Sequence, residues 1–441
     1  MKTENMGSKK VIDLSMTELF AGIGAQTRAK NNLLANKDII KQIIGDCEIN
    51  FNVVAISEWD IKSIISNDLL NNGLQETFPN YDNLEKAQML EFLDQFTLSK
   101  DGSKPCDKSY IHKFKFEKIR ELYIAMKRTR NLGSIMDIKG VDLPHTDVMT
   151  YSFPCTDLSL AGNCAGLEIG TRSGLLWEVK RILEELNSIS KLPKFLIMEN
   201  VEALLFKKNI DKWTIFTNYL EQLGYKNTTI VLNAQDFGVT QHRKRAFCIS
   251  VLGGTKEVEV TKVTREANLI DFLKLNDVNS TNKYINEYKD AMPKLTPSRI
   301  KYIEKCKTIN DNGNCMTITT KQDRAPNAGL LFCDENGLLS ENRTDINING
   351  DYAPYRFLTA REQLMLMGFN ENDFDKLNAK GISKATIEKQ AGNSIVVQIL
   401  EAIFTSIIKM QIMENEIFTP INNTEYMIDE NDNFIAVPNI A

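Results

Sequence analysis

Apolar segments alternate with longer segments of mixed polarity over roughly the first 250 residues of the chain. Leu14–Phe20, Asn52–Ile56, Asp147–Ser152 and Phe195–Met198 carry many apolar or β-branched residues and are bounded by polar residues or glycine, which is typical of buried strands. The stretches between them are long enough for helices. The alternation predicts an α/β fold built on a doubly wound sheet.

The remaining pattern predicts further strands and helices and an insertion. Strands are expected around 234–239 and 241–245, and a C-terminal helix from 394 to about 410. Residues 71–133 form an insertion, with helices near 84–96 and 112–129 that flank the polar loop Ser99–Pro105.

Composition narrows the picture only slightly. Hydrophobic residues make up 42% and charged residues 25% of the chain, as in globular proteins, and the net charge of −5 argues against a surface that is basic all over. No apolar run approaches the roughly 18 residues of a membrane span, so we expect a cytoplasmic protein without membrane contact. The eight cysteines form no CxxC pair and only three histidines are present, so no metal site is expected.

Two segments suit a nucleotide. The first predicted strand breaks at Phe20-Ala21-Gly22-Ile23-Gly24 and leads into a helix at Ala25, so glycine and a helix N-terminus meet in one turn. Glu58 follows the second strand, where an acidic residue of a doubly wound sheet holds a ribose, and Trp59 offers a ring for an adenine. A surface loop with a half-buried tryptophan is the alternative interpretation of the second segment.

A possible nucleophile follows the third predicted strand. Cys155 comes after Pro154 at the carboxyl end of that strand, where α/β sheets bind ligands, and a thiolate is a strong nucleophile. A buried cysteine without chemical function is the alternative. Glu199 follows the next strand, and Arg243 and Arg245 lie beside the last strand pair. The combination indicates a nucleotide cofactor that faces a covalent site.

The motifs occur in the order that is typical of one enzyme family. They are Phe20–Gly24, Glu58-Trp59, Phe153-Pro154-Cys155, Glu199-Asn200-Val201, Gln241 to Arg245 and Gln390 to Ser394. In this set the chain resembles the DNA (cytosine-5) methyltransferase family of bacterial or phage type. The resemblance implies a Rossmann-like catalytic and cofactor-binding domain over 1–254, which uses S-adenosyl-L-methionine and leaves S-adenosyl-L-homocysteine as product. It also implies a smaller target recognition domain over 255–352 and a C-terminal segment, 353–441, that returns to the first domain. The substrate it implies is a cytosine in a short site of double-stranded DNA.

The resemblance also implies a role for each catalytic residue. Cys155 would add to carbon 6 of a cytosine that is flipped out of the duplex, and Glu199 would share a proton with ring nitrogen N3. Arg243 and Arg245 would orient the base and Glu199, with Arg245 the stronger candidate. The base that removes the carbon 5 proton is not identified, and water is a candidate.

Binding residues follow from the same resemblance. The expected cofactor-binding residues are Phe20, Ala21, Gly22, Ile23, Gly24, Ala25, Glu58, Trp59, Asp137, Ile138, Pro154, Leu175, Asn393 and Ser394. The expected DNA-binding residues are Ser159 and Arg172 in a glycine-rich loop over 158–174, Gln241, and Thr319, Thr320, Lys321, Gln322 and Arg324 in the predicted recognition domain.

Some features depart from the family, and some questions stay open. Thr156 stands where most members have glutamine, and the insertion 71–133 is long enough to be a DNA-contacting or a partner-binding arm. An RNA cytosine methyltransferase of the same fold and a DNA-binding regulator without catalysis are the competing hypotheses. We expect a monomer that is either the modification enzyme of a restriction system, with a cognate restriction endonuclease as possible partner, or a solitary methyltransferase.

Overall fold

The computed structural model describes most of the chain. The described residues are 11–45, 47–74, 84–154, 173–263, 269, 273, 278–294, 296–303, 309, 313–321, 326–339, 355–418, 426–428 and 434–436. Five residues of the predicted site lie outside this set: Cys155, Ser159, Arg172, Gln322 and Arg324.

A six-stranded sheet forms the centre of the molecule. Its strands are β1 (Val11–Leu19), β2 (Glu48–Ser57), β3 (Val148–Tyr151), β4 (Phe195–Val201), β5 (Tyr225–Asn233) and β7 (Lys244–Leu252). They lie in the order β2-β1-β3-β4-β7-β5, with β1 to β4 parallel and β7 antiparallel to both neighbours. The prediction of a doubly wound α/β sheet is confirmed, and every residue of the central strand β3 is buried, as expected for a parallel strand covered on both faces.

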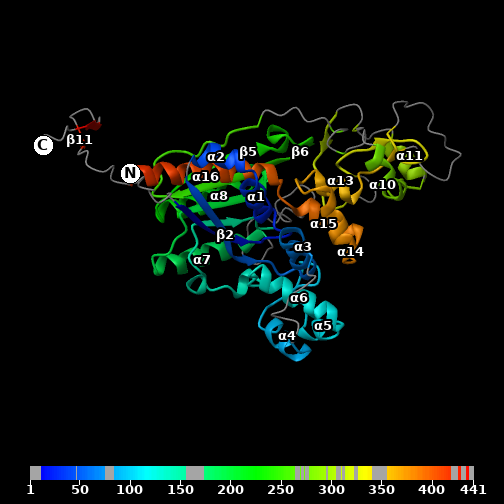
Figure 1. Cartoon of the computed structure of the whole chain (residues 1–441), viewed down its shortest axis with the longest axis horizontal. Coiled ribbons are helices and arrows are strands. Elements are labelled where there is room, and N and C mark those ends of the chain that lie inside the picture. The colour runs from blue at the N-terminus through cyan, green and yellow to red at the C-terminus, as the bar shows by residue number, and fades with distance from the viewer. Residues whose placement is uncertain are drawn as a thin grey trace, which may run out of the picture.

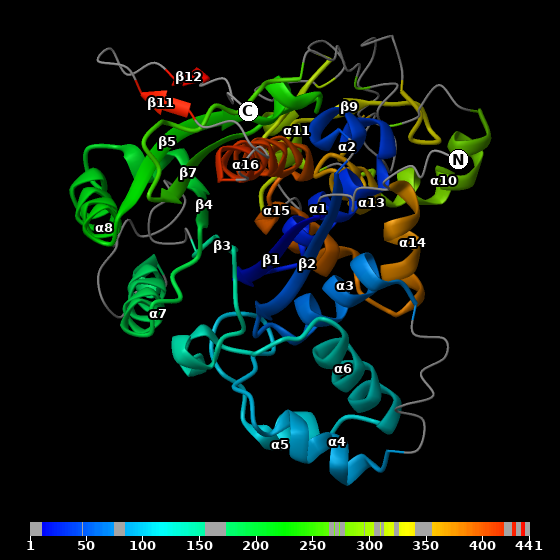
Figure 2. The same cartoon turned by 60° about the vertical axis from the view of Figure 1, so that its left-hand side comes forward.

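Helices cover both faces of the sheet (Figure 1). One face carries α1 (Ala25–Ala35), α2 (Lys37–Ile44), α3 (Ile61–Asn72) and α16 (Val397–Phe418), and the other carries α7 (Leu176–Ser188) and α8 (Ile210–Gln222). Figure 2 shows α7 and α8 on one side of β3 and β4, with α1 and α16 on the other. The helix predicted to start at Ala25 does so, and the C-terminal helix returns to the first domain as expected.

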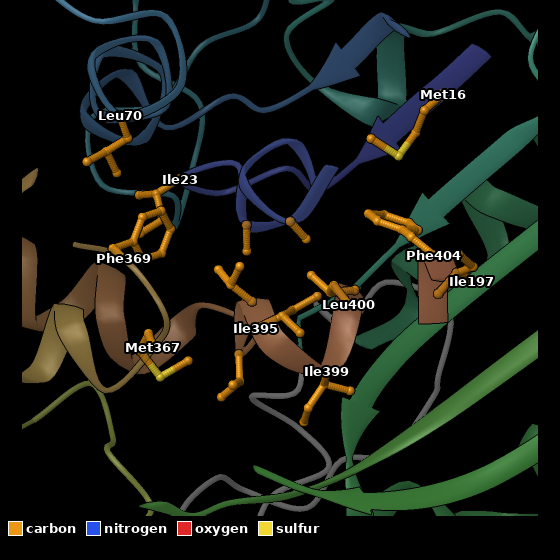
Figure 3. Close-up of a cluster of buried hydrophobic side chains, with 14 of the residues drawn as sticks. Met16, Ile23, Leu70, Ile197, Met367, Phe369, Ile395, Ile399, Leu400 and Phe404 are labelled. Atoms are coloured by element: carbon orange, nitrogen blue, oxygen red, sulfur yellow. The ribbon is translucent and has the colours of Figure 1, made fainter. Parts of the chain in front are cut away.

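The C-terminal helix α16 is part of the core. Phe404 is fully buried and meets Phe51 of β2 edge to face, with ring centroids 5.4 Å apart. Figure 3 shows Leu400 and Phe404 gathered with Met16 of β1 and Ile197 of β4. By length and composition, the described stretch Lys384–Met413 is long and apolar enough to cross a membrane, although no such segment was expected from the sequence. In the structure, however, 61% of its most apolar window is buried inside the protein. Burial of that kind is typical of a core helix in a globular protein.

The insertion folds as a helical unit against α3. It consists of α4 (Lys86–Leu93), α5 (Lys108–His112) and α6 (Phe116–Arg128). Helices α4 and α6 lie close to the two predicted positions, whereas α5 was not predicted. Several of its basic side chains hold it in place: Arg128 pairs with the buried Asp68 at 3.0 Å, and Lys127 lies 3.8 Å above the ring of Phe92. These charges serve packing, so the basic run does not present all of its members to a nucleic acid.

The rest of the described chain forms smaller elements. These are the short helices Ile135–Asp137, Gly140–Asp142, Ser173–Leu175, Glu202–Leu205 and Ala234–Phe237, the strands β6 (Gln241–His242), β8 (Cys315–Met316), β9 (Leu331–Phe332), β10 (Tyr355–Arg356), β11 (Tyr426–Ile428) and β12 (Phe434–Ala436), and the helices α10 (Val278–Asp290), α11 (Pro297–Ile303), α13 (Ala360–Met365), α14 (Glu371–Ala379) and α15 (Lys384–Asn393). The pairs β6–β8 and β9–β10 join the predicted recognition region to the flanking segments.

Two arginines fasten this region to the C-terminal segment. Arg356 is fully buried, donates from Nε to the carbonyl of Gly337 at 2.7 Å, and donates two 2.8 Å hydrogen bonds to the carboxylate of Glu362. Arg361 bridges Glu287 of α10 and Asp375 of α14, each at 2.6 Å. Because these planar guanidinium groups make forked contacts, they fix the orientation of α10 against α13 and α14.

Candidate active site and cofactor pocket

A cavity lies where strands β1 to β4 end. It has a volume of about 590 Å³, and its lining includes the turn after β1, the end of β2, the end of β3 and Glu199 of β4. The chain runs from β1 to its neighbour β2 on one side, and β3 lies on the other side, so this is the topological switch point of the sheet. Ligands of open α/β sheets bind at that point.

A carboxylate joins the glycine-rich turn to β2. Glu58 accepts hydrogen bonds from the backbone N–H groups of Gly22 at 2.8 Å, Trp59 at 2.9 Å and Asp60 at 2.7 Å. Burial raises the pKa of Glu58 to about 7, although these N–H donors favour its charged form. Gly24 must be glycine, since its φ is +75° and a Cβ would lie 2.4 Å from the side-chain amides of Asn67 and Asn71.

Most of the predicted cofactor residues meet in this cavity. Those that line it are Phe20, Ala21, Gly22, Ile23, Ala25, Glu58, Trp59, Pro154, Leu175, Asn393 and Ser394. They come from five separate parts of the chain. Gly24 is not among the lining residues and acts instead through its close packing against α3.

Asp137 and Ile138 do not line the cavity. The residues that line it here are the three before them, Ser134, Ile135 and Met136. Ser134 caps a short helix by accepting the N–H of Met136 at 3.3 Å, and the turn that follows carries the chain away from the cavity. Ile138 is buried in the core, and the carboxylate of Asp137 accepts the N–H of Thr97. The adenine contact expected of Asp137 and Ile138 therefore stays a prediction.

Glu199 combines burial with a nearby positive charge. It lies two residues before the end of β4 with 8% of its surface exposed, and its Oε1 lies 3.3 Å from Nε of Arg245 on the adjacent strand β7. Burial raises the pKa of Glu199, while the guanidinium groups of Arg245 and Arg243 act in the opposite direction. A carboxyl group in this balance holds its proton to a higher pH than an exposed glutamate does.

The neighbouring residue fixes the end of β3. Asn200 donates a 3.0 Å hydrogen bond from its side-chain amide to the carbonyl of Phe153, and its oxygen accepts the N–H of Val201 at 2.8 Å. Because Asn200 is buried, this contact holds the Phe153-Pro154 segment against β4. Cys155, the next residue, lies outside the described residues.

Arg243 has a different environment from Arg245. Its guanidinium donates to the carbonyl of Ile318 at 2.8 Å, and to those of Gly392 and Ser394 at 3.0 and 2.8 Å. It therefore ties the segment after β8 to the end of α15. The same contact requires glycine at position 392, where a Cβ would lie 2.5 Å from the backbone of Thr319.

Gln241 also has a supporting position. It is fully buried, donates to the carbonyl of Leu366 at 3.0 Å and accepts the N–H of Ile318 at 3.0 Å. A side chain enclosed in this way does not reach DNA, so the DNA contact predicted for Gln241 is replaced by a role in positioning. Of the described recognition candidates, Thr320 lines the cavity, Lys321 is exposed, and Thr319 donates to the carbonyl of Lys321.

The sequence did not identify part of the cavity wall. The unpredicted lining residues include Gln26, Lys62, Ser63, Lys100 to Ser103, Ser134 to Met136, Thr386, Lys389 and Gln390. Two of these groups come from the insertion and from α15, which are far from the nucleotide motifs along the chain. Within the described residues, His, Cys, Asp and Glu form no group suited to a metal ion.

The fold is that of an α/β methyltransferase. The structure is similar to that of the Schizosaccharomyces pombe Dnmt2 methyltransferase, with a TM-score of 0.51, 16% identity, and coverage of 90% of this chain and 99% of that one. It is likewise similar to Entamoeba histolytica methyltransferase EhMeth, with a TM-score of 0.53, 15% identity and coverage of 92% and 99%. At these identities the likeness shows the fold alone.

Sequence comparison gives the family. The model of the C-5 cytosine-specific DNA methylases matches residues 107–409. Orphan methyltransferase M.SssI of Spiroplasma monobiae is 32% identical over 414 residues, which cover 92% of this chain and 99% of the relative. Type II methyltransferase M2.ScrFI of Lactococcus lactis subsp. cremoris is 33% identical over 405 residues, which cover 90% and 100%. The chain belongs to the C-5 cytosine-specific DNA methylase family, which confirms the resemblance seen in its motifs, and it is a DNA (cytosine-5-)-methyltransferase.

Proposed function

We propose that this enzyme methylates carbon 5 of a cytosine flipped out of duplex DNA, with Cys155 as the covalent nucleophile. The observation that carries the proposal is the buried Glu199 beside Arg245 on the cavity wall, next to a β3 end that Asn200 holds in place. Glu199 supplies a carboxyl group that can share a proton, and the Pro154-Cys155 step after β3 supplies the thiol. Attack on carbon 6 of cytosine requires both groups.

The cavity fits S-adenosyl-L-methionine. Its volume of about 590 Å³ lies within the range of roughly 300–1,000 Å³ that is typical of small-molecule sites. Glu58 and Trp59 would hold the ribose and the adenine, with Ser134 and Ile135 beside them, and Asn393 would close the methionine side. When bound, this cosubstrate supplies a methyl group made electrophilic by its sulfonium. S-adenosyl-L-homocysteine leaves the same pocket.

The protein groups make the cytosine reactive. Carbon 5 of cytosine is a poor nucleophile until the Cys155 thiolate adds to carbon 6 and the ring becomes enamine-like. The negative charge that develops at N3 takes a proton, or a strong hydrogen bond, from Glu199. Arg245 holds Glu199 in place and balances its charge. Once carbon 5 carries the methyl group, a base takes the carbon 5 proton and the bond between Cys155 and carbon 6 breaks.

The target base must leave the duplex before this chemistry is possible. Flipping the base costs a few kcal/mol. This cost is offset by contacts to the position that the base leaves in the duplex and by closing of the loop 158–174 over the flipped base. We assign these contacts to Ser159 and Arg172, and recognition of the site to the domain 255–352 through Thr319, Thr320, Lys321, Gln322 and Arg324. The relatives include type II and orphan methyltransferases, so the setting is a restriction–modification system with a companion endonuclease, or a solitary enzyme. We propose a cytoplasmic, nucleoid-associated monomer.

The proposal is tested by methyl transfer from labelled S-adenosylmethionine into unmethylated duplex DNA of mixed sequence, with the modified nucleosides identified by mass spectrometry. The expected product is 5-methylcytosine, which disappears with Cys155→Ser and persists with Cys47→Ser, a change at a half-buried free cysteine outside the cavity. Labelling of a tRNA in place of duplex DNA would favour the RNA methyltransferase hypothesis. Duplex binding without any transfer would favour the regulator.

A further inference from the structure

A loop of the insertion is attached to the cofactor end of β2. The backbone N–H of Ser99 donates to the carbonyl of Trp59 at 2.7 Å, and the carbonyl of Ser99 accepts the N–H of Ile61 at 2.9 Å. Ser99 is fully buried. The loop thus begins beside the tryptophan that is proposed to stack on adenine, although 40 residues separate the two along the chain.

The loop is closed on itself. Ser99 and Pro105 form an antiparallel bridge, and Cys106 donates to the carbonyl of Leu98 at 2.9 Å, so the two ends lie side by side. Inside the loop, the hydroxyl of Ser99 donates to the carbonyl of Lys104 at 2.6 Å and accepts the N–H of Gly102 at 3.0 Å. These contacts give the loop a defined shape, which a binding surface requires.

A second contact joins the loop to α15. Nζ of Lys389 donates to the carbonyl of Asp101 at 2.8 Å across 288 residues of sequence. The same helix ends at Asn393, which lines the cavity, and Lys389 itself lines it as well. The loop therefore spans from the end of β2 to the helix that closes the opposite side of the pocket.

The residues between the loop ends face the pocket. Lys100, Asp101, Gly102 and Ser103 all line the cavity together with Trp59. They add backbone and hydroxyl groups to a wall that the glycine-rich turn, β2 and β3 leave incomplete. Polar groups of this kind can contact the adenine edge or the ribose and can keep water from that end of the ligand.

We propose that the segment Lys100–Ser103 is part of the cofactor site and sets how tightly S-adenosylmethionine and S-adenosylhomocysteine are held. Lys389 is a positioning residue that keeps this segment against α15. The inference rests on the proposed function, because it assumes that the cavity binds this nucleoside. On this inference the insertion contributes to cofactor binding, in addition to any contact with DNA or a partner.

The test shortens the loop and measures binding directly. Residues 100–104 are replaced by Asn-Gly, a turn that joins adjacent antiparallel strand ends. Calorimetric titration of the full-length enzyme with S-adenosylhomocysteine is expected to show binding weakened about tenfold, the loss that one or two contacts produce. The single-turnover rate at saturating cosubstrate and the KM for DNA should stay within about twofold of the wild type, since chemistry and DNA contacts are elsewhere.

A pair of point variants supports the test if the shortened loop impairs folding. Lys389→Met removes the hydrogen bond to Asp101 and is expected to weaken S-adenosylhomocysteine binding about threefold. Lys384→Met is the matched control, because Lys384 lies on the same helix but pairs with Asp290 and does not line the cavity. Equal affinity in the wild type, the shortened enzyme and Lys389→Met would overturn the inference. A wild type that binds no S-adenosylhomocysteine would instead contradict the proposed function.

Discussion

Glu199 occupies an environment in which two effects oppose each other. Burial favours its neutral form, whereas Arg245 at 3.3 Å and the nearby Arg243 favour its charged form. The net effect is a raised pKa, so a larger fraction of Glu199 stays protonated at neutral pH than for an exposed glutamate. This suits a group that shares a proton with a ring nitrogen during the reaction.

Glu199→Gln is expected to lower the single-turnover methyl-transfer rate by roughly 10²- to 10⁴-fold, because the amide cannot supply a proton. S-adenosylhomocysteine binding should be unchanged. The wild-type rate should decline as the pH rises and Glu199 ionises, and this decline should be absent in the variant. Glu202→Gln, three residues further on and outside the cavity lining, serves as control. A normal rate for Glu199→Gln would remove Glu199 from the chemistry.

A second buried carboxyl group affects stability. Glu18 of β1 is fully buried, accepts a hydrogen bond from the hydroxyl of Thr27, and has its pKa raised to about 7 by burial, although Thr27 and the ammonium of Lys30 act against this rise. In the unfolded chain Glu18 ionises near 4.5. As pH rises from about 4.5 to about 7, the unfolded state loses this proton first, so the contribution of Glu18 to stability falls across that window.

Glu18→Gln should therefore raise the free energy of unfolding relative to the wild type at pH 8, with a much smaller difference at pH 5. Denaturant unfolding at the two pH values measures this. Glu221→Gln, at an exposed position on α8, should show little difference at either pH. A benefit of Glu18→Gln that is larger at pH 5 would show that the sign of the argument is wrong.

Single residues were predictable where their position follows from a strand end. Glu58 and Glu199 follow apolar segments whose carboxyl ends meet in a parallel sheet, and both line the cavity. Asp137 and Ile138 do not line the cavity, because a serine cap turns the chain three residues earlier, and that cap has no clear signal in the sequence. The burial of Gln241 depends on Leu366 and Ile318, which are remote in sequence, so its supporting role could not be foreseen.

At the scale of elements, Arg243 connects two segments that are far apart in the sequence. The segment after β8 carries Thr319 to Lys321, and the end of α15 carries Asn393 and Ser394. A guanidinium can donate to three carbonyl groups in a fixed plane, whereas the ammonium of lysine cannot reproduce that geometry.

Arg243→Lys is expected to raise KM for both S-adenosylmethionine and DNA by about tenfold, because two segments lose their common anchor. Steady-state kinetics with each substrate varied in turn give the two values. Arg299→Lys, on α11 of the predicted recognition region, is the control with the same substitution. A change confined to the rate at saturating substrates would indicate direct participation in the reaction instead.

The elements themselves were predicted best where the period of apolar residues is clear. β1 to β4, α1 and the insertion helices α4 and α6 lie close to their expected positions. The short pairs β6–β8 and β9–β10 were not predicted, because each strand has two residues and its partner is distant in sequence. For the same reason, the contact between the loop at 99–105 and the pocket was not evident.

At the scale of the whole molecule, the C-terminal segment completes the first domain. Helix α16 lies against α1 and the sheet, and it follows directly after the cofactor-lining residues Asn393 and Ser394 (Figure 2). The order of motifs predicted this return. The packing that stabilises it could not be predicted, since Phe404 contacts Phe51 across more than 350 residues of sequence.

Phe404→Ala is expected to lower the free energy of unfolding by about 3–5 kcal/mol, the usual effect of removing a large buried ring. It should also lower the affinity for S-adenosylhomocysteine through the adjoining 393–394 segment. Denaturant unfolding and calorimetric titration measure the two effects. Met413→Ala, with 61% of Met413 exposed, should leave both unchanged. Unaltered stability of Phe404→Ala would mean that α16 is not an integral part of the core.

The central claim is a covalent bond between Cys155 and carbon 6 of the target cytosine. The most direct test incubates the enzyme with S-adenosylmethionine and duplex DNA in which cytosine is replaced by 5-fluorocytosine, because fluorine cannot leave as the carbon 5 proton does and the adduct accumulates. We predict a protein–DNA complex that survives denaturation, depends on S-adenosylmethionine, and maps to a peptide containing Cys155. A complex attached at another residue, or equal trapping with Cys155→Ser, would contradict the account.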